Sequence, residues 1–156
     1  QQQQQQQRPH PSTLQQKIFI LSRRGYFDNI QICKEANDFL SCWWECDISG
    51  DCLLEPYHFT RMPVAVHAKK GKKDYFFISL HTKSKSLANG KKMWQSRDPT
   101  KMLKFVKDAV KNRRRIFTEC ARVRKMIDEI IFKNYSNPHI IVCGDMNDGP
   151  GFDLFE

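Results

Sequence analysis

A short apolar run, Ile140 to Cys143, stops at Gly144 and is followed by Asp145 and Asn147. The run is too short for a typical helix and ends at a glycine, so it predicts a buried β-strand that leads into a loop. Proteins often place their chemistry on loops that a rigid strand positions. A carboxylate can accept a proton or bind a metal ion, and an amide can hydrogen-bond a phosphate oxygen. This segment therefore predicts an α/β enzyme with a site at the strand end.

Residues 144–150 read Gly-Asp-Met-Asn-Asp-Gly-Pro and resemble the G-D-x-N-D-x-P motif of the endonuclease/exonuclease/phosphatase superfamily. This superfamily includes deoxyribonuclease I-like nucleases, apurinic endonucleases, sphingomyelinases and inositol polyphosphate phosphatases. Residues 75–85 resemble the family strand that ends in H-L-K-S-K, and residues 17–23 resemble its L-L-S-R strand. The resemblance spans residues 17–156. It implies a partial four-layer α/β sandwich, with mixed, largely antiparallel sheets and flanking helices.

The resemblance also implies divalent-metal-dependent hydrolysis of phosphate esters, with Mg²⁺ (or Mn²⁺) as cofactor. Asp145 would orient or deprotonate the attacking water and contribute a metal ligand. Asn147 would donate to the phosphoryl oxygens, and His81 would donate to a non-bridging oxygen. Residues expected to bind the substrate phosphate are Lys83, Ser84 and Arg61.

The expected catalytic residues also have a structural interpretation. Asp145 and Asn147 would serve equally well to cap backbone donors in a turn. His81 would be a half-buried histidine bonded to a backbone carbonyl, and Lys85, which extends the same motif, would belong to a solvated loop. Spacing alone leaves both interpretations open.

The chain has 26 Lys and Arg residues against 17 Asp and Glu residues, a formal charge of +9. Such a balance suits an anionic partner, and nucleic acid is favoured. The alternative is a phosphoesterase that hydrolyses a phosphoinositide or a sphingolipid. A solvated basic surface would give the same charge.

The family's metal-binding Glu, its early Asn and its closing Asp-His pair have no counterpart in this sequence. We therefore expect the chain to be truncated at both ends and to turn over little substrate by itself. The alternative is a catalytically inactive family remnant that binds nucleic acid or another anionic partner.

Residues 1–16 begin with seven glutamines and continue with a polar bias, which predicts a disordered tail before one domain at 17–156. No signal-peptide pattern and no apolar run of membrane-spanning length is visible, so an intracellular location, cytoplasmic or nuclear, is expected. Cys120 and Cys143 fall at apolar positions and are expected to be buried thiols. The spacing of Cys42, Cys46 and Cys52 does not match a standard zinc site.

The hydrophobic pattern predicts most of the elements. Strands are expected at 17–21 and 30–33, an irregular region at 34–60, and a hairpin of strands 62–68 and 74–82, the second of them central. A long helix should begin at Asp98, with Pro99 in its first turn, and end at 134–138. Its apolar stripe is expected at Met102, Val106, Ala109, Ile116, Cys120, Val123, Ile127 and Ile130.

Overall fold

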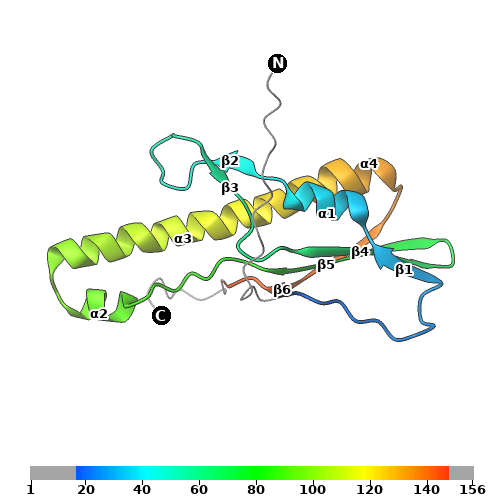
Figure 1. Cartoon of the computed structure of the whole chain (residues 1–156), viewed down its shortest axis with the longest axis horizontal. Helices are drawn as coiled ribbons and strands as arrows, with labels where there is room; N and C mark the ends of the chain where they lie inside the picture. Colours follow the sequence, from blue (N-terminus) through cyan, green and yellow to red (C-terminus); the bar gives the residue numbers. More distant parts are fainter. Residues whose placement is uncertain (1–16, 148–156) are drawn as a thin grey trace, which may run out of the picture.

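The computed structural model describes residues 17–147 and shows one four-stranded sheet, one two-stranded sheet and helices (Figure 1). The α/β class expected from the sequence is therefore confirmed. The predicted tail at 1–16 and the end of the motif, Asp148 to Pro150, lie outside the described residues. The elements in chain order are β1 (Asn29–Ile32), α1 (Lys34–Ser41), β2 (Trp44–Cys46), β3 (Glu55–Tyr57), β4 (Val64–Lys70), β5 (Lys73–His81), α2 (Gly90–Gln95), α3 (Pro99–Met126), the π-helical turn η1 (Ile127–Ile131), α4 (Phe132–Asn134) and β6 (His139–Asp145).

The larger sheet has the order β1-β4-β5-β6. β4 pairs antiparallel with both β1 and β5, whereas β6 pairs parallel with β5. A parallel neighbour requires a long crossover connection, and α2, α3 and α4 supply it. The predicted hairpin and the central position of its second strand are confirmed.

Helices cover one face of this sheet (Figure 1). Phe76, Ile78 and Leu80 alternate along β5 and are buried against Met126 and Ile131 of the long helix. α1 adds Ala36 and Leu40, both fully buried, to the same core. The period-two pattern of β5 thus places three large apolar side chains under the helices.

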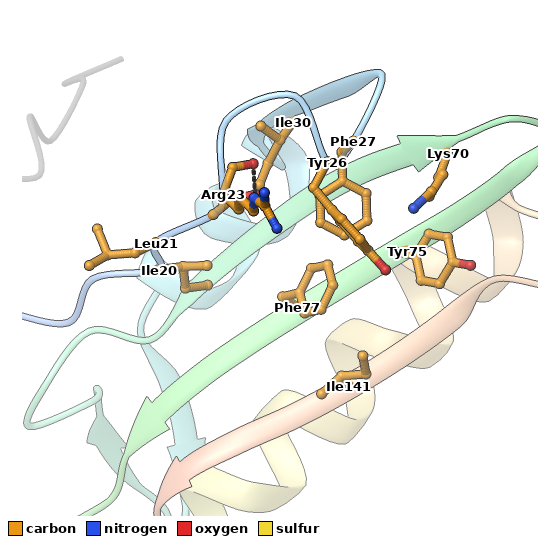
Figure 2. A pocket seen from close by; sticks show the side chains of 11 residues that line it. Ile20, Leu21, Arg23, Tyr26, Phe27, Ile30, Lys70, Tyr75, Phe77 and Ile141 are labelled. Atoms are coloured by element: carbon orange, nitrogen blue, oxygen red, sulfur yellow. Dashed lines mark hydrogen bonds between the residues drawn. The ribbon is translucent and has the colours of Figure 1, made fainter.

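The opposite face of the sheet carries Tyr75 and Phe77 of β5 and Ile141 of β6. Residues 20–27 run beside this face, and Figure 2 shows Tyr26 and Phe27 near these side chains. The rings of Phe27 and Phe77 lie 5.7 Å apart. A hollow of about 420 Å³ remains between the segment and the sheet. Ile141 is still 45% exposed, so this face is only partly covered.

The long helix begins as expected. The Asp98 side chain accepts hydrogen bonds from the backbone N–H groups of Thr100 and Lys101, at 2.9 and 3.3 Å. These two bonds, that of Lys101 first, hold the pKa of Asp98 below its usual value. The helix continues through η1 and ends at Asn134, which confirms the predicted end.

The buried stripe of α3 differs from the predicted one. Cys120 and Val106 are exposed, whereas Phe105, Asn112 and Glu119 are buried. Ile116, Val123 and Ile127 are buried as predicted, whereas Val106 and Cys120 each lie one residue from a buried position, and two of the buried positions are polar. A pattern search that accepts only apolar residues therefore drifts to the neighbouring positions.

Three further expectations are wrong. Residues 17–21 pair with no strand in the described chain, and Leu21 is 93% exposed. The segment 34–60 is not irregular, because it holds α1 and the hairpin of β2 and β3. Cys143 is exposed, since it lies on the partly covered face of the edge strand β6. All six cysteines are free thiols.

Within residues 17–147, no helix has both the length and the apolar character needed to cross a membrane.

Candidate functional site

The parallel pairing of β5 and β6 brings two predicted catalytic residues together. His81 and Asp145 end their strands as register partners. Nε2 of His81 lies 3.6 Å from Oδ2 of Asp145, with 28% and 61% of the two side chains exposed. His81 and Asp145 are 64 residues apart in the sequence, and the sheet places them side by side at the accessible ends of two strands.

The glycine before Asp145 permits this close approach. Gly144 has a φ of +131°, and a Cβ atom there would collide with the carbonyl oxygen of Leu80. A larger residue would push β6 away from β5 at the point where the two functional side chains emerge. Gly144 is thus required by the geometry of the strand pair.

Asn147 is positioned by two hydrogen bonds. Its backbone N–H donates to Oδ1 of Asp145 at 2.9 Å, and its Nδ2 donates to the carbonyl oxygen of Thr82 at 2.7 Å. Its φ of +51° lies in the left-handed region, which asparagine tolerates better than most residues. Asn147 therefore holds both the Asp145 carboxylate and the chain just after His81.

Thr82 joins the two strand ends. Its backbone N–H donates to the carbonyl oxygen of Asp145 at 3.0 Å, and its hydroxyl donates to the carbonyl oxygen of Met146. Nη1 of Arg61 donates to the Thr82 carbonyl oxygen at 3.1 Å. The Arg61 guanidinium is therefore held directly behind the strand ends.

A buried carboxylate on α3 fixes the next residue of the loop. Glu119 is only 1% exposed, and its Oε2 accepts the backbone N–H of Lys83 at 2.7 Å. Its Oε1 accepts the hydroxyl of Tyr57 at 3.0 Å and the backbone N–H of Thr60 at 3.3 Å. Burial, followed by the charge of Glu119, raises the pKa of Tyr57 well above its usual value. Glu119 thus ties two separate segments, residues 57–60 and the loop at Lys83, to the long helix.

An open hollow of about 500 Å³ lies in front of the strand ends. Ser84 and Lys85 line one side, and Asp145 and Asn147 line the other. The Lys83 side chain lies in a separate hollow of about 340 Å³, beside Arg115 and Trp43. The structure therefore brings Ser84 and Asp145 together and directs Lys83 to the neighbouring surface.

The residues at this edge suit one particular mode of metal binding. Within residues 17–147, no three side chains of His, Cys, Asp or Glu surround a common point. Mg²⁺ commonly binds through one or two carboxylates and completes its shell with water and substrate phosphate. Asp145, exposed at the mouth of the hollow, meets the requirement for one such carboxylate.

Sequence reasoning missed Glu119, Thr82 and Tyr57. A glutamate in the middle of an amphipathic helix is normally an exposed residue, because burial of its charge is costly. The predicted stripe has Cys120 rather than Glu119 at this turn, so the pattern gave no signal of its burial. Only the fold shows the donors that satisfy it.

Comparison with protein-family models, with curated proteins and with solved structures found no match to this chain.

Proposed function

We propose that this chain carries a divalent-metal-dependent phosphoesterase site, with phosphodiesters, and nucleic acid in particular, as the favoured substrate. The observation that supports it is the His81–Asp145 pair at 3.6 Å, of which Asp145 lines an open hollow. A carboxylate and an imidazole at that distance match the acid–base and phosphate-binding groups that such hydrolysis needs. The resemblance to the endonuclease/exonuclease/phosphatase superfamily supports the same reaction.

The proposed roles follow from the hydrogen bonds. Asp145 accepts a proton from the attacking water through Oδ2, since its Oδ1 already accepts the Asn147 N–H. His81 donates from Nε2 to a non-bridging phosphate oxygen. Ser84 donates from its hydroxyl to another oxygen across the hollow. Asn147 keeps the Asp145 carboxylate in position, and correct positioning of a reacting group lowers the barrier of the reaction.

Mg²⁺ or Mn²⁺ bound to Asp145 would neutralise charge on the phosphate and position the reacting oxygens. Arg61 adds fixed positive charge behind the strand ends. A net charge of +9 attracts a polyanionic substrate over a longer range.

The four-layer sandwich belongs to the same proposal. A sandwich of this kind packs two sheets face to face, so each sheet needs one apolar face free of helices. The face of Tyr75, Phe77 and Ile141 has that character. We propose that it packs against a second sheet.

Hydrolysis of a panel of substrates tests the proposed function. Single-stranded oligonucleotide, bis(p-nitrophenyl) phosphate, and vesicles that contain phosphatidylinositol bisphosphate or sphingomyelin are each incubated with Mg²⁺, with Mn²⁺ and with EDTA. We expect slow, EDTA-sensitive cleavage of the first two substrates. His81→Gln should lower the rate about 100-fold or more.

His139→Gln is the matched control, because His139 is exposed at the opposite end of β6 and stacks on Tyr75. It should retain the rate. Cleavage of the vesicle lipids alone would favour the lipid phosphoesterase. An equal rate in the two histidine variants, or no metal-dependent turnover, would refute the proposed enzyme.

One observation favours binding without catalysis as the second candidate. In the described residues a single carboxylate, Asp145, faces the hollow, where a tightly held cation usually needs more anionic ligands. Oligonucleotide binding that persists in a chain without turnover would support this candidate.

A further inference from the structure

A second groove, basic and partly aromatic, adjoins the candidate site. It lies between α2 and the first half of α3 and has a volume of about 550 Å³. Lys85, Lys91 and Arg113 contribute three cations to its lining, and Trp94 contributes an indole. None of the ten described residues that line it is acidic.

The aromatic side of the groove is rigid. Trp94 packs against Phe105 with ring centroids 5.8 Å apart, and its side chain remains 38% exposed. Gly90 lies so close to Phe105 that a Cβ atom would approach the ring to 2.8 Å, which keeps α2 tight against α3. One surface of the indole is thus supported, and part of it still faces the solvent.

The groove adjoins the hollow at the strand ends. Lys85 and Ser86 line both. The Asn112 amide donates to the carbonyl oxygens of Lys85 and Ser86, at 3.5 and 3.4 Å, and so fixes this shared wall to α3. Lys85 and Ser86 therefore form a wall common to the groove and to the hollow that Asp145 lines.

The acidic residues at the start of α3 do not cancel this charge. Asp98 caps the helix and lies 3.5 Å from Nζ of Lys101. Asp108 pairs with Lys104 at 2.8 Å. Each of these carboxylates thus has a lysine partner on its own helix.

We propose that this groove binds single-stranded nucleic acid, with Lys91 and Arg113 on the backbone phosphates and Trp94 stacked on a base. The proposal deepens the proposed function and rests on it, since it places the strand that leads to Asp145. Cations beside an exposed aromatic ring are the usual means of holding an unpaired strand. An inositol headgroup offers phosphates but no π face, and a duplex keeps its bases inside.

Fluorescence anisotropy of labelled oligothymidylate, measured in EDTA so that no cleavage occurs, tests the proposal. Trp94→Ala should weaken binding about 5- to 150-fold, and Trp94→Phe should retain most of the affinity. Lys91→Gln should lower the salt dependence of log K by about 0.7 for one lost phosphate contact. Circular dichroism verifies that each variant is folded.

Lys125→Gln is the control, because Lys125 is an exposed lysine on the last turn of α3 that pairs with Glu129. It should bind like the parent chain. Equal affinity in Trp94→Ala and the parent would overturn the proposal. Equal affinity for a duplex, or preferential binding to phosphatidylinositol bisphosphate vesicles, would overturn it too. If Trp94→Ala is unfolded, Lys91→Gln still decides the matter, because an unaltered salt dependence in that variant would overturn the proposal.

The two proposals fail separately. Loss of oligonucleotide binding in the groove variants, together with no metal-dependent hydrolysis of bis(p-nitrophenyl) phosphate, would support the groove and refute the phosphoesterase. Metal-dependent hydrolysis that needs His81, together with unaltered binding in the groove variants, would support the phosphoesterase and refute the groove.

Discussion

Glu119 shows how one residue connects the long helix to the candidate site. It is buried, and hydrogen bonds from the Tyr57 hydroxyl and from the backbone N–H groups of Thr60 and Lys83 satisfy its carboxylate. The loop that follows His81 is therefore held from behind by α3. The site therefore depends on residues, such as Glu119, that a motif search does not identify.

Replacement of Glu119 by alanine should destabilise the protein by about 2–4 kcal/mol, because several buried donors lose their acceptor. Urea denaturation measures this change. Glu129→Ala is the control, since Glu129 pairs with Lys125 on the exposed side, and its change should stay within about 0.5 kcal/mol. Similar values for the two variants would show that Glu119 is not a structural acceptor.

Tyr57 should make the stability depend on alkaline pH. Its pKa is raised in the folded state above the ordinary 10.0, mainly by burial and then by Glu119. The unfolded chain therefore loses this proton first, and the stability present below pH 10.0 is lost as the pH rises further. Tyr57→Phe should flatten the fall of the urea midpoint above that pH. A fall of equal steepness in both proteins would contradict the assigned environment.

At the scale of elements, the sequence predicted those whose pattern is carried by apolar residues. Hydrophobic patterning and capping preferences predicted the hairpin of β4 and β5, the Asp98 cap and the strand that begins at residue 139. α1 was missed because only Ala36 and Leu40 of its eight residues are buried, and two positions do not make a visible stripe. The strand expected at 17–21 has apolar residues but no partner in the described sheet, and strand formation depends on that partner.

Leu40→Ala tests whether α1 is an integral part of the core. Leu40 is fully buried, so its truncation should cost about 2–5 kcal/mol in unfolding free energy. Leu103→Ala is the matched control, because Leu103 is 56% exposed on α3 and its loss should cost less than about 0.5 kcal/mol. Equal costs in chemical denaturation would mean that α1 does not pack as described.

For the whole molecule, the sheet has two unlike faces. Helices cover one face (Figure 1), whereas the other face keeps exposed apolar side chains on β1 and β6, namely Ile30, Ile32 and Ile141. An exposed apolar face of this kind marks an interaction surface in most proteins. No local sequence rule predicts which face remains open, because both faces of β5 are apolar.

Adjacent residues of β6 test this asymmetry. Ile140 packs against the core under the helices, and Ile141 lies on the open face, 45% exposed. Ile140→Ala should cost about 1–2 kcal/mol more than Ile141→Ala, because more buried methylene surface is lost. Equal losses in urea denaturation would indicate that the second face is covered as well as the first.

The most direct test of the central claim compares two aspartates in metal-dependent turnover of bis(p-nitrophenyl) phosphate. Asp145→Asn keeps the shape of the site and removes the carboxylate, and Asp38→Asn removes an exposed carboxylate that pairs with Lys34 on α1. We expect the Mg²⁺-dependent rate to fall about 100-fold or more in the first variant and to remain unchanged in the second. Equal rates in both variants would contradict the assignment of Asp145 as the catalytic carboxylate.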